Sequence, residues 1–248
     1  MGRQERLGAI LERVGKDGSV DVKALAAKLG VSGATVRRDL QELSRSQLLV
    51  RTHGGALAND AAPPLSETPH HAEKRRIGHA AARLVGDNAV VGLTGGSTAL
   101  ELARALVGRR GITVVTNAIN IAMQLAMRPQ IRTVVTGGVV HARSYELVGA
   151  YADAVLGSIT LDLAFIGVNG LDAMVGPTSH DEREAAVNAL MASRAAHPVL
   201  VADASKIDKR AFAAIGHRRL FPTVITDASA TLEQRQRLAD SGYDVIVA

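Results

Sequence analysis

Residues 71–248 alternate between short apolar segments and longer segments with helical spacing, and this alternation limits the possible folds more than any other feature of the chain. Short apolar runs are typical of buried strands, whereas apolar residues three or four positions apart are typical of amphipathic helices. Regular alternation of the two predicts an α/β domain with a mostly parallel sheet flanked by helices. The expected strands are residues 89–93, 112–115, 131–135, 161–166, 199–202, 224–226 and 245–247, and the expected helices include residues 98–107, 119–127, 182–194 and 232–241.

Residues 1–57 have a different pattern, which predicts a small domain of three helices and a β-wing. Gly30 permits a tight turn before the third helix, and Ser32 caps that helix. Residues 48–55 then look extended and end in a glycine pair, as a wing would. The inward stripes of the three helices are Leu7, Ile10, Leu11 and Val14, then Val22, Leu25, Ala26 and Leu29, then Val36, Leu40 and Leu43.

Residues 58–70 separate these two patterns. They hold three prolines and little large apolar side chain, which is typical of an interdomain linker. The expected organisation is therefore a winged helix-turn-helix in residues 1–57, a linker in residues 58–70 and a larger α/β domain in residues 71–248.

The net charge of +5 is concentrated in the first domain. Residues 1–57 contain ten Lys and Arg against six Asp and Glu, whereas the rest of the chain contains nineteen against eighteen. A local basic excess favours binding to a polyanion, although a solvated basic face has the same composition.

The third helix carries the side chains that could contact DNA. At about 100° per residue, Arg38 points away from the apolar stripe and Arg37 projects sideways, toward the position of a phosphate. A small, polar and basic outer face suits the major groove, where Arg38 could contact guanine edges. The alternative is a small helical bundle with solvated arginines, in which Arg38 pairs with Glu42. The expected DNA-binding residues are Ser32, Ala34, Thr35, Arg37, Arg38 and Gln41, with Arg51 and His53 in the wing.

A glycine-rich turn follows the strand expected at residues 89–93. Gly95 and Gly96 expose backbone N–H groups, the next helix adds positive potential, and Ser97 and Thr98 supply hydroxyl groups. The turn could hold a phosphate or another oxyanion, although many such turns are rich in Gly and Ser for steric reasons alone. Polar residues also follow other strands, at the sheet edge where open α/β sheets bind ligands; they are Asn117, Gly138, Asn169, Gly170, Asp203 and Lys206.

Two stretches of the first domain resemble the signature of DeoR-type bacterial transcription regulators. Residues 31–43 read VSGATVRRDLQEL, and residues 51–56 read RTHGGA. The resemblance continues through the second domain and so spans nearly the whole chain. Its positions there are Lys74, Ile77, Gly95, Ser97, Thr98, residues 115–117, Gly137, Gly138, Asp162, Ala164, Phe165, Asn169, Gly170, Glu184, Ala185, Asp203, Ser205 and Lys206.

This resemblance implies a winged helix-turn-helix followed by an effector domain with the fold of phosphopentose isomerases, which senses phosphorylated sugars or related metabolites. Residues 95–98 would hold the phosphate, Lys206 would lie near the sugar, and Glu184 would be a helix N-terminal residue or a ligand contact. Thr94, which is also expected at the effector, departs from the family, which often has an Asp there to contact sugar hydroxyls. The class of effector therefore stays open.

A sugar-phosphate isomerase fused to a DNA-binding module is the rival interpretation. Such a reaction needs a base that moves a proton between adjacent carbons, and the related isomerases use an acidic cluster after the central strand. Here apolar residues 163–165 follow Asp162. We therefore expect a regulator with no catalytic residue. A purely architectural DNA protein is disfavoured as well, because it would need no large ligand-binding domain.

The expected regulator represses a carbohydrate-metabolism operon. Its partners would be double-stranded operator DNA, a small-molecule effector, and further copies of itself in a dimer or tetramer, because helix-turn-helix proteins usually bind two half-sites. No cofactor or metal is expected, since the chain has no cysteine and no His, Asp and Glu residues with metal-ligand spacing. Without a signal peptide or an apolar run of about 18 residues, the protein is expected in the cytoplasm and not in a membrane.

Overall fold

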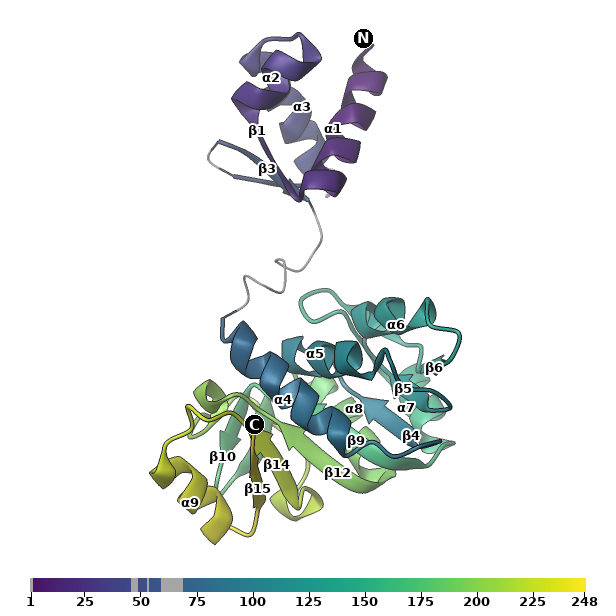
Figure 1. Ribbon diagram of the computed structural model, residues 1–248, viewed down its shortest axis with the longest axis vertical. Coiled ribbons are helices and arrows are strands. Elements are labelled where there is room, and N and C mark those ends of the chain that lie inside the picture. The colour runs from purple at the N-terminus through teal and green to yellow at the C-terminus, as the bar shows by residue number, and fades with distance from the viewer. Residues whose placement is uncertain (1, 46–48, 53, 59–68) are drawn as a thin grey trace. The chain divides into compact units, whose positions relative to one another are not determined.

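The computed structural model describes residues 2–45, 49–52, 54–58 and 69–248, and the chain divides into two compact units, residues 1–68 and residues 69–248 (Figure 1). Each unit is built around its own cluster of buried apolar side chains. The expected α/β class, with a small winged helix-turn-helix before a larger domain, is confirmed.

The described residues of the first unit form three helices and an antiparallel three-stranded sheet. Helix α1 spans Arg3–Asp17, α2 spans Val22–Leu29 and α3 spans Gly33–Arg45. Strands β1 (Ser19–Asp21), β2 (Leu49–Arg51) and β3 (Gly55–Ala58) pair in the order β1-β3-β2. The hairpin of β2 and β3 is the expected wing. The sequence pattern does not predict β1, because three residues with one apolar side chain between two polar ones give no strand signal.

Local side chains fix where α2 begins and ends. Oδ1 of Asp21 accepts hydrogen bonds from the backbone N–H groups of Lys23 (2.8 Å) and Ala24 (3.1 Å), as an N-cap residue does. Gly30 ends the helix in the left-handed conformation, with φ of 64°, which costs glycine little. The chain then turns directly into α3, so α2 and α3 form the helix-turn-helix.

Gly55 brings the wing close to β1. A Cβ atom at Gly55 would lie 1.8 Å from the backbone oxygen of Val20, so no other residue fits there without moving the backbone. Next to it, the N–H of Val22 donates a 2.9 Å hydrogen bond to the carbonyl oxygen of Gly54. The glycine pair seen in the sequence therefore fastens the wing to the start of α2.

A seven-stranded parallel sheet forms the centre of the second unit, in the order β15-β14-β12-β9-β4-β5-β6. All seven expected strands belong to it. Their bounds are Val90–Leu93 (β4), Thr113–Thr116 (β5), Arg132–Val135 (β6), Leu161–Gly167 (β9), Ala195–Val201 (β12), Thr223–Thr226 (β14) and Asp244–Val247 (β15). The expected helices are also present, as α5 (Ser97–Leu106), α6 (Ile119–Ala126), α8 (Glu182–Ser193) and α9 (Leu232–Asp240).

The second unit also has elements beyond those expected. Helices α4 (His71–Arg83) and α7 (Ala150–Gly157) join the four above, and a hairpin pairs β7 (Val139–His141) with β8 (Glu146–Val148). A small antiparallel sheet contains β10 (Gly170–Asp172), β11 (Gly176–Ser179) and β13 (Ala213–Ala214). Short 3-10 helices lie at Ala204–Lys206 (η2) and Arg218–Leu220 (η3). In the described parts of the chain, no helix is long and apolar enough to cross a membrane.

The chain order of the strands reverses between β4 and β9. From β4 the chain continues to β5 and β6 on one side, and it returns to β9, β12, β14 and β15 on the other. With right-handed crossovers, the connecting helices of the two halves lie on opposite faces of the sheet. The turns after β4 and β9 therefore diverge and leave a crevice at the carboxyl ends of these strands, where open α/β sheets bind ligands.

Helix α4 packs closely against α5, in front of the sheet as drawn in Figure 1, whereas α8 lies behind it. Gly78 lies at the crossing of the two helices. A Cβ atom there would be 2.7 Å from the carbonyl carbon of Glu101 and from the nitrogen of Leu102, so the close approach depends on glycine. Because α5 begins at the turn after β4, α4 packs against the helix that borders the crevice.

Candidate DNA-binding face and effector cleft

The outer face of α3 is polar and open to solvent. Arg37, Arg38 and Gln41 are exposed, as is Ala34, whereas Thr35 is half-buried. Within the described part of the first unit, neither arginine has an ion-pair partner. The opposite face of α3 is buried in the core of the unit through Val36, Leu40 and Leu43. The helix therefore presents the guanidinium groups of Arg37 and Arg38 on a surface held by a packed interior.

Ser32 fixes the start of this helix. Its Oγ accepts a hydrogen bond from the N–H of Thr35 (3.1 Å) and lies 2.9 Å from Oγ1 of the same residue. The first turn is thereby held in place with two hydroxyl groups beside it. A helix N-terminus of this kind suits a phosphate oxygen, and phosphate contacts are what position a protein along a duplex.

Among the described side chains, two ion pairs join α1 to α3. Two guanidinium nitrogens of Arg6 donate hydrogen bonds to the buried Asp39, from Nε to Oδ2 at 2.6 Å and from Nη2 to Oδ1 at 3.1 Å. These bonds raise the pKa of Arg6. Arg3 pairs with Glu42. The alternative pairing of Arg38 with Glu42 is therefore not formed, because Glu42 is engaged by α1.

The wing contributes one further described basic group. Arg51 is exposed at the end of β2. The N–H of Thr52 donates to the carbonyl oxygen of Gly55 at 3.1 Å and closes the turn. His53, also expected at the DNA, lies outside the described residues.

A cleft of about 150 Å³ opens at the carboxyl ends of β4, β9 and β12, where the strand order reverses. Its walls come from the turns after these three strands, from α4 and α8, and from the loop between β7 and β8. The sheet topology thus collects residues that are far apart in the sequence around one small space.

The turn after β4 forms one end of this cleft. Gly96, with φ of 101°, precedes α5, and among the described residues no side chain caps this helix. Its first N–H groups and the hydroxyl group of Ser97 therefore remain available to an anion. Gly95 is required because a Cβ there would lie 2.5 Å from Oε1 of Glu146.

Two lysines border the same end. Lys206 ends η2, and Lys74 comes from the first turns of α4. Nζ of Lys74 donates a 2.7 Å hydrogen bond to the carbonyl oxygen of Pro69 and lies 4.0 Å from Oδ2 of Asp203. Burial lowers the pKa of Lys74; Asp203 opposes this shift, and Lys206 adds to it. An anion in the cleft would relieve the repulsion between the two cations.

Glu146 lies beneath the turn after β4. Its Oε2 accepts a 3.0 Å hydrogen bond from Nδ2 of Asn117, a residue that is itself fully buried. Burial raises the pKa of Glu146 to about 8, and the nearby charge of Glu184 adds to the shift, whereas the bonds from Asn117 and Gly95 oppose it. At neutral pH this carboxyl group is therefore mostly protonated and can donate a hydrogen bond into the cleft.

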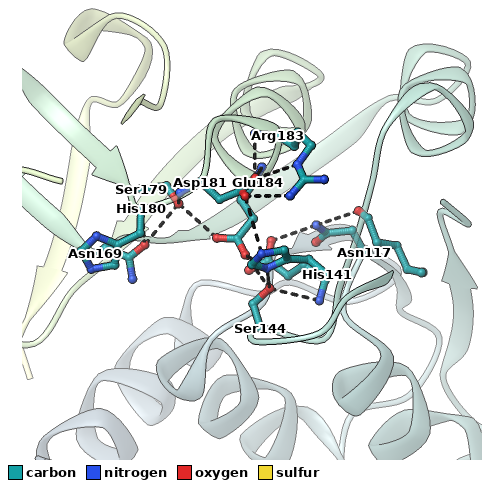
Figure 2. A network of polar contacts seen from close by, with 11 residues as sticks. Asn117, His141, Ser144, Asn169, Ser179, His180, Asp181, Arg183 and Glu184 are labelled. Atoms are coloured by element: carbon teal, nitrogen blue, oxygen red, sulfur yellow. Dashed lines mark hydrogen bonds and ion pairs between the residues drawn. The ribbon is translucent and has the colours of Figure 1, made fainter. Parts of the chain in front are cut away.

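Glu184 is the centre of the polar network shown in Figure 2. Its Oε1 accepts from Oγ of Ser144 at 2.5 Å and lies 2.7 Å from Nδ1 of His141, and its Oε2 accepts from Oγ of Ser179 at 3.1 Å. Ser179 is also within 3.2 Å of Oδ1 of Asn169. The network ties the β7–β8 loop to α8 and holds Glu184 in one orientation.

Asp181 begins α8 beside this network. Its Oδ1 accepts from the N–H groups of Arg183 (2.9 Å) and Glu184 (3.2 Å), and its Oδ2 lies 3.5 Å from Nε2 of His141. The hydrogen bond from the Arg183 side chain lowers the pKa of Asp181 to about 2. Asp181 therefore stays ionised and orients the N-terminus of α8.

Two acceptor atoms in the walls have no hydrogen-bond partner within the described structure. They are Oδ2 of Asp203 and Oδ1 of Asn188, and both residues are buried. Buried acceptors that lack a donor are costly, so these two atoms indicate where hydroxyl or amine groups of a ligand would bind. Across the described residues, no cluster of His, Asp and Glu is suited to hold a metal ion.

Seven of the eleven expected effector-binding residues line the cleft: Gly95, Gly96, Ser97, Thr98, Asn169, Glu184 and Lys206. The other four do not. Oγ1 of the fully buried Thr94 accepts a 2.9 Å hydrogen bond from the N–H of Gly167. The buried Asn117 donates a hydrogen bond to Glu146, which itself lines the cleft. Gly138 and Gly170 are close-contact positions, where a Cβ would meet backbone atoms of Val148 and Lys209. The Thr94 side chain therefore bonds to β9 and is not part of the cleft wall.

Sequence reasoning did not assign six polar lining residues as contacts: Lys74, Ser144, Glu146, Ser179, Asn188 and Asp203. Asp203 could have been predicted to line the cleft because it follows an expected strand. Lys74 could have been predicted because it is one of the positions that resemble the family. Ser144 and Glu146 gave none, because a hairpin brings them to the cleft and no local pattern marks it.

Residues 6–62 match the DeoR-like helix-turn-helix domain, and residues 69–228 match the DeoR C terminal sensor domain. The chain belongs to the DeoR family. It is therefore a DNA-binding transcription regulator with a sensor domain, and the family assignment excludes the rival interpretation of an isomerase. The predicted family and the predicted class of function are confirmed.

Relatives within the DeoR family are similar along their whole length. The HTH-type transcriptional regulator GlpR of Haloferax volcanii is 33% identical, over 98% of this chain and 96% of its own. The glycerol-3-phosphate regulon repressor of Escherichia coli K12 is 29% identical over 97% of both chains. The HTH-type transcriptional repressor CsqR of the same strain is 28% identical, over 96% of this chain and 93% of its own.

One solved structure with a distant likeness is ribose 5-phosphate isomerase A of Methanocaldococcus jannaschii. It is 19% identical, with a TM-score of 0.43, over 56% of this chain and 55% of its own. At this distance the likeness says nothing about activity.

Proposed function

We propose that this DeoR-family regulator represses a carbohydrate-metabolism operon and that a phosphorylated sugar or related metabolite, bound in the cleft, changes its affinity for operator DNA. The observation that carries the proposal is the division of the cleft into two ends. One end has the uncapped N-terminus of α5 with Lys206 and Lys74, which suits a phosphate. The other has carboxyl and amide groups, including Glu184 and Asn169, which suit sugar hydroxyls.

The DNA-binding side of the proposal assigns the exposed face of α3 to the major groove. Arg38 would contact a base edge, and Arg37, Thr35 and Ser32 would contact phosphates. Ala34 and Gln41 would lie along the same groove, and Arg51 would add a backbone contact from the wing. A single small unit of this kind binds weakly, so we propose a dimer or tetramer that places two units on two half-sites.

Regulation then follows as a shift of populations. The effector can change operator affinity only by binding more tightly to one arrangement of the two DNA-binding units than to another. Two of the similar proteins are named repressors. Because a repressor acts while it is bound to the operator, we propose that effector binding releases this regulator from DNA.

Thermal denaturation with a panel of compounds tests the effector class. The panel contains glycerol 3-phosphate, ribose 5-phosphate, fructose 1-phosphate, glucose 6-phosphate and the same compounds without phosphate. A ligand at a hundred times its Kd stabilises the folded state by about 2.7 kcal/mol, so a true effector raises the Tm clearly. A phosphate compound that raises the Tm while its dephosphorylated form does not supports the proposal; equal responses to both forms contradict it.

Selection of duplexes from a random pool tests the DNA side. The enriched sequences are expected to contain two related half-sites whose centres are separated by about 10 base pairs or a multiple of that spacing. The stabilising phosphate compound is then expected to shift the Kd for that duplex. Enrichment of no sequence above the starting pool would contradict the assignment of α3.

A further inference from the structure

Lys74 contacts both the cleft and the first residue of the second unit. Its ammonium group lies in the cleft wall and donates a 2.7 Å hydrogen bond to the carbonyl oxygen of Pro69. Pro69 is where the second unit begins, so every covalent path from this unit to the first unit runs through it. One buried side chain, 8% exposed, thus connects the ligand site to the end of the interdomain segment.

The segment that this lysine contacts, Pro69 and His70 at the start of α4, has a strained backbone and, within the described structure, no helix cap. His70 precedes α4 in the left-handed conformation, with φ of 60°, which is costly for a residue with a side chain. Among the described residues no side chain caps α4. The backbone N–H of Lys74 donates to the carbonyl oxygen of His70 at 3.0 Å, and its ammonium holds Pro69. The first of these is a backbone bond that any residue other than proline could make, so the contact specific to lysine is the one from its ammonium group to Pro69.

The same ammonium group has unused capacity on the cleft side. A lysine has three N–H donors, and the bond to Pro69 uses one of them. Oδ2 of Asp203 lies 4.0 Å away, beyond hydrogen-bond distance, and has no hydrogen-bond partner in the described structure. The lysine is thus placed between a neutral carbonyl oxygen that it binds and an anionic oxygen that it does not reach.

We infer that Lys74 is the residue that couples occupancy of the cleft to the interdomain segment, by exchanging the carbonyl oxygen of Pro69 for an anionic oxygen of the ligand. A phosphate attracts the ammonium group by its full negative charge, whereas the carbonyl oxygen of Pro69 offers only a dipole, so a bound phosphate draws Nζ toward the cleft and away from Pro69. Once the bond to Pro69 is lost, the strained segment at His70 is free to relax. This inference rests on the proposed function, because it needs an anionic ligand in the cleft.

The test compares variants of the two cleft lysines in the full chain. Lys74→Met removes the bond to Pro69 and the charge, Lys74→Gln does so with a polar side chain, and Lys74→Arg keeps a cation. Lys206→Met is the matched control, because it removes a charge from the same cleft without touching Pro69. The probe is the panel compound that raises the wild-type Tm most. Inorganic phosphate is used instead if no panel compound raises the Tm more than phosphate does. The readout is the ratio of operator Kd values with saturating probe and without it.

For the wild-type chain we expect a ratio in the usual allosteric range of about 5 to 150. Lys206→Met should need more probe but reach a similar ratio at saturation. Lys74→Met and Lys74→Gln should bring the ratio below about 2, and Lys74→Arg should retain part of it. Full coupling in both Lys74→Met and Lys74→Gln at saturating probe overturns the inference.

Hydrogen exchange of residues 70–75 provides a readout that does not depend on DNA. The probe should accelerate exchange there in the wild-type chain, whereas in Lys74→Met exchange should already be fast without probe. Equal slow exchange in both proteins without probe also overturns the inference. If no phosphate compound raises the Tm of the wild-type chain, the proposed function itself is contradicted. The two failures are therefore distinguishable.

Discussion

The two candidate sites use charge in opposite ways. On α3, Arg37 and Arg38 are exposed and have no ion-pair partner among the described residues, whereas the ionisable groups of the cleft are mostly buried and are held largely by hydrogen bonds with neutral groups. Exposed charges attract a polyanion from a distance and are screened by salt. Buried, oriented groups select a ligand by geometry and are screened far less. The first unit is thus built for a long repetitive polyanion, and the second for one small molecule.

The largest effect is expected where the scaffold of the first unit is broken without any change in charge. Gly55→Ala forces a Cβ into the backbone of β1, and we expect it to destabilise the first unit by about 3 kcal/mol or more. Operator binding should be lost, while a phosphate compound should still stabilise the second unit. Calorimetry and operator titration measure both.

Gly8→Ala is the matched control for this change. It lies in the same unit, in α1, with no atom within 4 Å of the new Cβ, and it should stabilise the helix by about 0.5–1 kcal/mol. Operator binding that survives Gly55→Ala would mean that the exposed charges act without the folded wing.

Ser97→Ala is expected to have the next largest effect, confined to the cleft. Loss of a hydroxyl bond to a charged ligand should weaken effector binding by about 1.5–3 kcal/mol. Operator affinity without effector should stay the same, as should the Tm without ligand. Isothermal titration with the active panel compound measures the change, and Ser158→Ala, an exposed serine outside the cleft, is the control. An unchanged Kd in Ser97→Ala would show that the turn after β4 is a steric feature only.

Arg38→Ala and Arg37→Ala should separate two roles on one exposed face. We expect Arg38→Ala to cost about 1–3 kcal/mol and to relax base preference at one position, as the loss of one base contact does. Arg37→Ala should weaken binding to all sequences and reduce the slope of log K against log salt by about one. If both variants change only the salt slope, then α3 reads no bases.

A further effect, which appears only when the pH is varied, concerns the protonated carboxyl group of the cleft. Because the folded chain raises the pKa of Glu146 from 4.5 to about 8, its stabilising contribution is complete below about pH 4.5 and is lost as the pH rises through about 8. The unfolding free energy of the second unit should therefore fall with rising pH in this window, by at most about 1.4 kcal/mol per pH unit.

Glu146→Gln, which cannot ionise, should flatten this dependence. Urea unfolding at several pH values measures the two slopes. Parallel curves for the wild-type chain and the variant would contradict the protonated state of Glu146 at neutral pH.

The sequence was sufficient where the determining interactions are local. The capped α3, the glycine turn before α5 and the seven strands follow from spacing, capping and β-branched runs, and the structure has all of them. Ser144 and Glu146 could not be predicted, because the pairing of β7 with β8 and the contact with α8 bring together residues that local patterns leave unrelated. The same holds for the buried Asp39, whose partner Arg6 lies on another helix. Thr94 shows the converse: it lies next to the glycine-rich turn in the sequence, but its hydroxyl oxygen is bonded to the neighbouring strand β9, which no local pattern indicates.

The strand order described above also determines when the cleft can be completed while the chain is being synthesised. Pairing of β4 with β9 joins Val91 to Leu163, and the cleft is incomplete until η2 with Lys206 has been made. Residues 1–68 form a separate compact unit whose chain is finished long before that point. At translation rates of about 5–20 residues per second, on the order of ten seconds pass between the two events. During that interval, under the proposed function, the growing chain is a DNA-binding protein that no effector can yet control.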